Sequence, residues 1–379
     1  MIEMFNAFTE EADSPELAAD DIRRALAGAA LSKNSVGVIH CHPDFVDSGA
    51  VAAVCGALPF DTVGSSTVAS SVNGASGKRI LTLAVLSGDD VEFDIGVSPE
   101  ISDGLTGPVE ELFRSLEPSP PKMFLACVPF ILEIGGDEFI EAIDKMSGGV
   151  PLFGTVPVSN DPKYSRRYTI HNGKCYERSI VLMALRGGVE PEFLMVPSDY
   201  RNILMQDAIV TSAGRNVLRA VNGMPAVKFF ESLGIMENGD VRSLTAVPMK
   251  FSSEDNPELI RGCSAVNPDG SLVMFGAVPE GSALSLSELD PGHMLKAVAN
   301  TMNEVLAMAN GRCMLMYSCV WRFWVLGRDA MAEHDSVRAR VGDASRFIMA
   351  QTGGEIFPAR VKNRTVNSFQ NNSFVICVL

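Results

Sequence analysis

The chain has 379 residues, of which 46% are hydrophobic and 20% charged, and its formal net charge is −15. This length and composition are typical of a globular protein of about two or three domains. The acidic balance disfavours nucleic acid and anionic membranes as partners, because both bind clustered Lys and Arg. The N-terminus lacks a signal-peptide pattern, and no apolar run approaches the ~20 residues that cross a bilayer. We therefore expect a soluble, cytoplasmic protein.

The first part of the chain alternates predicted helices and strands. Ser14-Pro15 predicts the start of a helix, because Ser is a favoured N-cap and Pro suits the first helical position. The elements predicted after this helix are a strand at 35–41, a helix at 47–58, a short strand at 60–67 and a longer strand at 78–88. The short strand ends in a Gly/Ser/Thr loop. The longer strand is apolar on both faces, which is typical of a central position in a sheet.

The same order of elements recurs twice. The second set comprises a strand at 121–130, a helix at 136–148, a short strand at 150–155 and a hairpin at 164–187, turned at Asn172-Gly173. The third set comprises a strand at 312–323, a helical stretch at 336–345, a short strand and Gly turn at 347–357 and a closing strand at 373–379. We interpret this as a β-α-β-β module present three times. A cysteine ends the first strand of each module: Cys41, Cys127 and Cys319.

Residues 189–312 follow a different pattern. The predicted elements there are a strand pair followed by a helix from Pro225, a hairpin at 260–281 turned at 267–270, and a long helix at 289–310. We place the domain boundary at 196–207, which divides the chain into 1–195 and 196–379. No low-complexity linker marks this boundary, so we expect the halves to pack together. The predicted fold is α/β (α+β type), with mixed β-sheets flanked by helices and built from the repeated modules in two packed halves.

Five sequence blocks resemble the FIST sensory domain family, in the family's order. TVGSSTVASSVNGASGKRILTLAVL (62–86) is similar to the N-terminal half. The blocks similar to the C-terminal half are NVLRAVNGMPAVKFFESLG, IRGCSAVNPDGSLVMFGAVPEGS, YSCVWR and GGEIFP. The resemblance spans nearly the whole chain and makes 1–195 the N-terminal and 196–379 the C-terminal FIST half. Two positions depart from the family pattern: Ser65 stands where Cys is frequent, and Trp321 where a small residue is usual, which implies a narrower or more aromatic pocket.

The resemblance implies a cytoplasmic small-molecule-binding sensory protein rather than an enzyme. Its ligand state would pass to a separate partner, a histidine kinase or a cyclic-dinucleotide enzyme. Amino acids are ligands proposed for the family, and one group of members resembles haem-based nitric-oxide sensors, so a haem gas sensor is the first alternative. A hydrolase or transferase using Cys319 or Ser66 is an alternative from another class. A homodimer is the default expectation, because homo-oligomers are common.

The candidate ligand contacts lie mainly at strand ends. The 64–67 turn offers backbone N–H groups and hydroxyls that can hold a carboxylate or phosphate, although a plain loop has the same composition. Arg322 could clamp a carboxylate and Glu355 an ammonium group, which would suit an amino acid; the alternative is an internal ion pair between them. The predicted ligand-binding residues are Ser65, Ser66, Thr67, Thr155, Arg261, Cys319, Trp321, Arg322, Gly354 and Glu355.

Several of these side chains also suit a structural role. Trp321 and Trp324 can stack on a flat ligand or fill space between sheet and helix. A nucleophilic cysteine needs a base and a lowered pKa, and no histidine is placed recognisably beside Cys319, since His334 falls in a loop-like stretch. We therefore interpret the Cys319 thiol as a small core side chain. The sequence also lacks the common nucleotide-binding, metalloprotease and serine-hydrolase motifs, so no catalytic residue is predicted.

Histidine supplies the candidate haem ligands. His40 and His42 are two residues apart and share a face if their strand continues that far, a spacing that can bind a metal or give an axial haem ligand. His293, at the start of a predicted helix, is the third candidate. A structural or surface role is the alternative for each. None of the eight cysteines forms a C-x-x-C pair, so no structural zinc site is predicted.

Overall fold

The computed structural model describes residues 2–161, 165–196, 207–237, 239–240, 244, 247–254, 257–287, 290–343 and 345–379. These residues form three six-stranded sheets and one eight-stranded sheet, with helices packed on them. The predicted α/β class, with mixed sheets flanked by helices, is therefore confirmed. None of the described helices has the length and apolar character needed to cross a bilayer.

The first sheet contains the three strands predicted for the first module, together with β1 and the hairpin β10–β11. Its strands, in spatial order, are β1 (Glu3–Thr9), β6 (Leu81–Ser87), β2 (Ser35–Cys41), β3 (Asp61–Ser66), β10 (Thr169–His171) and β11 (Lys174–Tyr176). β2 and β3 are parallel, and all other neighbours are antiparallel. The helices that belong to this part of the chain are α1 (Pro15–Leu26), α2 (Pro43–Asp47) and α3 (Ala50–Gly56).

The second sheet has the same arrangement of strand directions. Its strands are β7 (Val91–Val97), β12 (Val181–Gly187), β8 (Met123–Cys127), β9 (Leu152–Thr155), β24 (Glu355–Val361) and β25 (Arg364–Gln370). β8 and β9 form the parallel pair. The helices α4 (Thr106–Ser115) and α5 (Gly136–Ser147) cover its outer face through a shared apolar cluster.

The third sheet follows the same order again. Its strands are β13 (Glu192–Met195), β26 (Phe374–Val378), β22 (Met314–Cys319), β23 (Phe347–Thr352), β4 (Ser70–Val72) and β5 (Ala75–Gly77). β22 and β23 form its parallel pair. The neighbouring helices are α7 (Pro291–Ala309), α8 (Val320–Val325), the 3-10 helix η2 (Gly327–Asp329) and α9 (Ala332–Val341).

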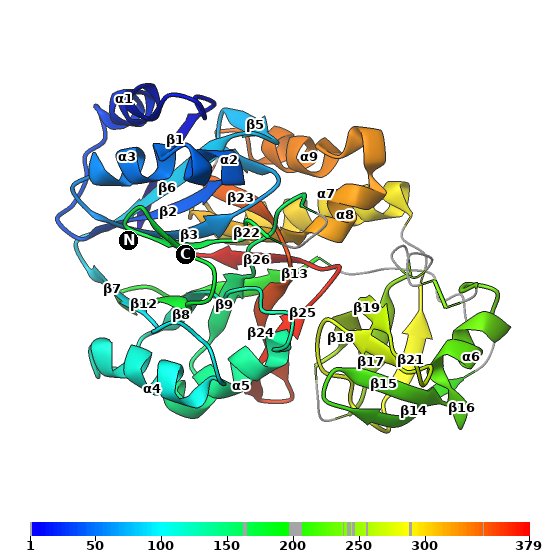
Figure 1. Ribbon diagram of the computed structural model, residues 1–379. Coiled ribbons are helices and arrows are strands. Elements are labelled where there is room, and N and C mark those ends of the chain that lie inside the picture. The colour runs from blue at the N-terminus through cyan, green and yellow to red at the C-terminus, as the bar shows by residue number, and fades with distance from the viewer. Residues whose placement is uncertain are drawn as a thin grey trace.

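In each sheet the outer hairpin comes from a different part of the chain than the parallel pair beside it. The hairpin β10–β11 follows β9 in the chain but pairs with β3 of the first sheet. The hairpin β24–β25 follows β23 but pairs with β9 of the second sheet. The hairpin β4–β5 follows β3 but pairs with β23 of the third sheet. The three sheets therefore exchange hairpins in a cycle. The side chains on their inner faces share one apolar core, while the helices lie outside (Figure 1). We call this assembly, residues 2–196 and 290–379 where described, the three-sheet body.

The predicted turn at Asn172-Gly173 is confirmed. Both residues have positive φ angles, 49° and 77°, as a two-residue hairpin turn of this kind requires. The turn joins β10 to β11, and β12 then returns the chain to the second sheet. The sequence stretch predicted as a single hairpin therefore supplies strands to two sheets.

The fourth sheet forms a separate unit with its own core. Its strands are β14 (Ala208–Gly214), β15 (Val217–Val221), β16 (Met224–Pro225), β17 (Met249–Ser252), β18 (Leu259–Arg261), β19 (Cys263–Val266), β20 (Leu272–Met274) and β21 (Ala283–Leu286), with helix α6 (Ala226–Ser232). We call it the fourth-sheet unit; it lies beside the three-sheet body (Figure 1). The predicted boundary at 196–207 lies outside the described residues except at its first and last positions, so the division into 1–195 and 196–379 stays a prediction.

Candidate functional site

The Gly/Ser/Thr turns at the ends of the three parallel strand pairs meet one another. They follow β3, β9 and β23 and occupy residues 66–69, 155–158 and 352–355. The hydrogen bonds that join them are Thr67 Oγ1 to Gln351 O (2.6 Å), Val158 N to Ser66 O (3.2 Å) and Val156 N to Gly354 O (3.0 Å). β3, β9 and β23 are each the second strand of the parallel pair in their sheet. Because the three sheets pack around one core, the turns that follow these strands meet.

The hydroxyl groups of the first turn are buried and already hydrogen-bonded within the protein. Ser65 Oγ lies 3.1 Å from His40 Nδ1, and Ser66 Oγ accepts a hydrogen bond from Tyr168 N at 3.0 Å. Thr67 Oγ1 donates to backbone carbonyl oxygens. In this structure the turn thus holds neighbouring segments together.

Arg322 is paired with a carboxylate that the sequence did not single out. Its guanidinium is 2% exposed, and its Nε lies 3.0 Å from Oε1 of the fully buried Glu333 on α9. Ser318 Oγ donates to the second oxygen of the same carboxylate. Glu333 is therefore a partner of Arg322 that the sequence analysis did not consider, and the Arg322 charge also acts to lower the pKa of Glu355.

Glu355 occupies a pocket of hydroxyl groups. Thr352 Oγ1 donates to one carboxyl oxygen at 2.5 Å, and Ser373 Oγ to the other at 2.7 Å. Burial raises the pKa of Glu355 to about 8, against the opposing effects of these hydrogen bonds and of the Arg322 charge. The Glu355 carboxyl is therefore mostly protonated at neutral pH, which leaves little negative charge for binding an ammonium group.

Cys319 ends β22 and begins the short helix α8. Its backbone N donates to Ser373 O at 2.9 Å. Burial raises the pKa of the Cys319 thiol well above its usual range, and the neighbouring Glu355 adds to the shift, against backbone N–H groups of Trp321 and Asn372. The side chain is thus a thiol, not a thiolate, at neutral pH.

The Asn371-Asn372 turn between β25 and β26 is the part of the site that the sequence analysis missed. Asn372 is fully buried, with its backbone in the left-handed region at φ 55°. Neither Oδ1 nor Nδ2 of Asn372 has a hydrogen-bond partner among the described residues. Buried amide groups are rarely left unpaired in native proteins, so this donor and acceptor call for a partner such as water or a ligand. The sequence signal was an Asn pair directly after a strand, since Asn tolerates positive φ.

Arg261 joins the fourth-sheet unit to the three-sheet body. Its side chain is fully buried, and Nη2 lies 2.9 Å from Asp137 Oδ1 on α5. Nη1 donates to Phe369 O at 2.6 Å, and Nε to Ala277 O at 2.9 Å. Asn371 N also donates to Ile260 O at 3.1 Å. We call this contact region between the two units the junction.

The two tryptophans have different environments. Trp321 is 8% exposed and packs edge-to-face on Phe275, with ring centroids 5.6 Å apart. Its ring also covers Gly262, where an added β-carbon would come within 1.9 Å of it. Trp321 therefore fills the junction, while Trp324 is 42% exposed on the surface. A small apolar cavity of about 30 Å³ lies nearby, lined by residues that include Phe130, Val156, Phe275, Gly353 and Phe369.

The three candidate haem ligands are not brought together. β2 ends at Cys41, so His42 leaves the strand and accepts a hydrogen bond from Asp44 N at 3.3 Å as the N-cap of α2. The strand does not continue to His42, so the condition under which His40 and His42 would share a strand face is not met. His40 lies in the central core, where burial lowers its pKa to about 4, and His293 is exposed in the first turn of α7. Among the described residues, no group of three or more His, Cys, Asp or Glu side chains could hold a metal ion.

His334 is also placed differently from the prediction. The sequence placed it in a loop-like stretch, but it is buried in α9 with Nδ1 2.9 Å from Ser71 Oγ. Burial lowers the pKa of His334 to about 4. It ties α9 to β4, a strand contributed by the N-terminal part of the chain.

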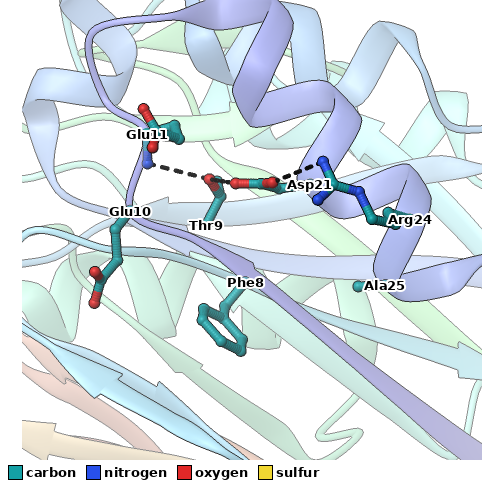
Figure 2. Close-up of a pocket in the computed structure, with 7 residues that line it drawn as sticks. All are labelled: Phe8, Thr9, Glu10, Glu11, Asp21, Arg24 and Ala25. Atoms are coloured by element: carbon teal, nitrogen blue, oxygen red, sulfur yellow. Dashed lines mark hydrogen bonds and ion pairs between the residues drawn. The ribbon is translucent and has the colours of Figure 1, made fainter.

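A hollow on the molecular surface lies away from the junction (Figure 2). Three of its polar side chains contact one another: Thr9 Oγ1 donates to Asp21 at 2.8 Å, and Arg24 pairs with the same carboxylate at 3.3 Å. The Arg24 side chain is 75% exposed, so solvent screens this pair. Thr9 is buried, but its hydroxyl is already paired with Asp21, so it does not resemble the unpaired amide of Asn372.

Two family models match the chain. A FIST N domain model matches residues 35–224, and a FIST C domain model matches residues 218–358. These matches show a sensory domain of the kind that recognises small ligands. The chain belongs to the FIST family.

The chain was also compared with curated proteins and with solved structures. No curated protein matches the chain. Among solved structures, the chain resembles the crystal structure of cyanuric acid hydrolase from A. caulinodans, with 8% identity and a TM-score of 0.33, over 100% of this chain and 98% of that one.

Proposed function

We propose that this protein binds a small molecule at the junction and passes its ligand state to a separate signalling partner, a histidine kinase or a cyclic-dinucleotide enzyme in the cytoplasm. The observation that carries the proposal is the unpaired amide of Asn372, buried where the strand-end turns, Cys319 and the fourth-sheet unit approach one another. Both polar atoms of this amide are buried without a partner among the described residues, close to the buried polar side chains of Arg261 and Glu355. This is the chemistry of a site that a ligand completes.

Two features favour binding over catalysis. The Cys319 thiol has a raised pKa, which weakens it as a nucleophile. Ser66 Oγ receives a hydrogen bond from the backbone of Tyr168, and His40 contacts Ser65 instead. Neither candidate nucleophile is therefore hydrogen-bonded to a general base among the described residues, although Glu355 lies near Cys319.

The junction also offers a way to signal to a partner protein that the ligand is bound. Arg261 and Trp321 contact both units, so a ligand placed between them alters how tightly the fourth-sheet unit is held. Output requires that the ligand bind one arrangement of the two units more tightly than another, because equal affinity shifts no equilibrium. A partner that recognises one arrangement would then read the ligand state.

The first experiment is native mass spectrometry and an absorption scan of the purified protein, followed by thermal denaturation with each of the proteinogenic amino acids. A bound small molecule, or a Tm increase that saturates with ligand, supports the proposal, since a ligand at 100 times its Kd stabilises the folded state by about 2.7 kcal/mol. The increase should be lost in Asn372→Gly, whose backbone tolerates the positive φ. Asn310→Gly is the matched control, because Asn310 is exposed, has φ 46° and lies at the end of α7.

The same measurements separate the alternatives. A Soret band that persists through purification would favour the haem sensor, and turnover or covalent labelling at Cys319 or Ser66 would favour the enzyme. A stabilising ligand whose effect is unchanged in Asn372→Gly would place the site elsewhere and overturn the proposal.

A further inference from the structure

The charges at the junction are already compensated by protein groups. Arg261 pairs with Asp137 at 2.9 Å, and Arg322 pairs with Glu333 at 3.0 Å. Arg261 also donates to the carbonyl oxygens of Ile260, Ala277 and Phe369. A carboxylate entering the junction would thus meet two guanidinium groups that each already have a carboxylate partner. Burying a further negative charge beside these pairs is unfavourable.

The carboxyl group of Glu355, in the turn after β23, does not supply a negative charge either. Glu355 is fully buried, and its oxygens accept hydrogen bonds from Thr352 and Ser373. Its pKa is raised to about 8, so the group is mostly neutral at pH 7. A cationic ligand therefore gains little there. The junction is polar but close to electrically neutral.

The Asn372 side chain offers a specific pattern for recognition. An amide carries an acceptor oxygen and a donor nitrogen side by side in one plane. A carboxylate can satisfy Nδ2 but presents lone pairs to Oδ1, and an ammonium group can satisfy Oδ1 but presents protons to Nδ2. A neutral group with an N–H beside a C=O satisfies both atoms at once.

The backbone on both sides of Asn372 is held in place. Asn371 N donates to Ile260 O at 3.1 Å, and Ser373 O accepts from Cys319 N at 2.9 Å. Ser373 in turn donates to Glu355. A group fixed before binding loses little conformational entropy when the ligand arrives, which favours a selective contact.

We propose that the ligand of this site is an uncharged molecule with adjacent N–H and C=O groups, such as a primary amide, a lactam or a nucleobase-type ring, paired with the Asn372 amide. This inference rests on the proposed function and narrows it. It differs from the amino acid suggested by the sequence, because a zwitterion carries the two charges that the junction does not complement.

The test uses matched pairs of probes that differ mainly in charge, with the full chain at pH 7. The pairs are nicotinamide and nicotinate, and lactamide and lactate; in a third pair, uracil and orotate, the N–H and C=O edge is kept and a carboxylate is added. Thermal denaturation over millimolar concentrations and isothermal titration calorimetry measure binding. We expect at least one neutral member to raise Tm and to bind at least tenfold more tightly than its carboxylate partner.

Two substitutions connect the effect to Asn372. Asn372→Gly removes the amide, and Asn372→Asp keeps the size but leaves acceptors only; both should weaken binding of the neutral probe at least tenfold. Asn310→Gly should leave it unchanged. Circular dichroism of each variant without probe shows that it folds. If Asn372→Gly does not fold, Asn372→Asp carries the test.

The outcomes distinguish the ligand class from the proposed function. If a carboxylate probe or glycine binds and that binding is lost in Asn372→Gly or Asn372→Asp, the ligand class is wrong and the proposed function stands. If a neutral probe binds equally well to all variants, or if none of the neutral probes binds, the ligand class is overturned. The amino-acid panel and native mass spectrum then decide the proposed function by themselves.

Discussion

Arg322 and Glu333 form a buried ion pair that ties α8 to α9, with Arg322 Nε 3.0 Å from Glu333 Oε1. Both side chains are almost completely removed from solvent, and Ser318 completes the carboxylate's hydrogen bonds. Because Ser318 of β22 and Arg322 of α8 both contact the Glu333 carboxylate, the pair fixes the chain on either side of Cys319. Its chemical role is therefore to stabilise the wall of the junction.

This pair predicts a large and asymmetric mutational effect. Glu333→Gln should lower the free energy of unfolding by about 3–5 kcal/mol, because it removes the buried carboxylate that pairs with the Arg322 guanidinium. The double variant Arg322→Met/Glu333→Leu should recover most of the loss, since an apolar pair needs no compensating charge. Urea unfolding followed by circular dichroism measures both.

An exposed ion pair in the same helix is the control. Arg338 and Asp335 are 40% and 55% exposed, so Arg338→Met should change stability by less than about 1 kcal/mol. A Glu333→Gln variant as stable as the wild type would show that Arg322 does not depend on Glu333.

Glu355 predicts a specific pH dependence. Its pKa is about 8 in the folded protein against a reference value of 4.5, so between these pH values the folded state holds a proton that the unfolded state releases. The contribution of Glu355 to stability is therefore full below pH 4.5 and falls as pH rises to 8, by about 3–5 kcal/mol over the whole range. Glu355→Gln removes the titrating group.

The measurement is the difference in unfolding free energy between Glu355→Gln and wild type across this pH range. The difference should move in favour of the variant as pH rises from 4.5 to 8 and level off above 8. A difference that is independent of pH would mean that Glu355 is ionised in the folded protein, which would also remove the electrical neutrality inferred for the junction.

Local sequence patterns predicted much of the fold. Apolar runs bounded by turn residues located the strands that form the parallel pairs, and Asn172-Gly173 located a hairpin turn whose positive φ angles follow from those residue types. The turns that close β3, β9 and β23 were also expected to be equivalent. The exchange of hairpins between sheets was not predicted, because it depends on pairing between segments more than a hundred residues apart, such as β9 with β24.

Side-chain partners in the site were harder to predict than strands. Glu333 lies on α9, in a stretch that the sequence analysis treated as loop-like, so it was not considered as a partner for Arg322. The cysteines at the strand ends also differ in direction: Cys41 packs with the helices outside the first sheet, whereas Cys127 belongs to the central core. Successive side chains on a strand point to opposite faces, so alignment by strand end does not reveal the face.

Trp321 and Gly262 predict a steric effect at the junction. A β-carbon at Gly262 would lie 1.9 Å from the Trp321 ring, so Gly262→Ala should destabilise the protein by about 1–3 kcal/mol and change its tryptophan fluorescence. Trp321→Leu in the same chain should restore part of the stability by giving the methyl group room. Thermal denaturation and emission spectra measure these effects.

Gly28→Ala is the matched control for this substitution. A β-carbon there meets no atom within 4 Å, so the variant should be as stable as wild type or more stable by less than about 1 kcal/mol. Unchanged stability and fluorescence in Gly262→Ala would contradict the close packing of the two units at Trp321.

Asp137 predicts how firmly the fourth-sheet unit is held. Asp137→Asn removes the carboxylate that faces Arg261 and weakens the hydrogen bond from Ala277 N, which is 2.6 Å long. We expect a loss of about 1.5–3 kcal/mol, because Arg261 keeps its carbonyl partners and Asp137 is partly exposed.

Amide hydrogen exchange locates this loss. Exchange should accelerate in β18 and β19, which carry Arg261 and its neighbours, and stay unchanged in β8 of the three-sheet body. Asp144→Asn is the control, because Asp144 lies on the same helix but accepts from Asn367 of the second sheet. Equal acceleration of β18 and β8 in Asp137→Asn would show that the two units unfold together, and occupancy of the junction could then not be read out as a movement of the fourth-sheet unit alone.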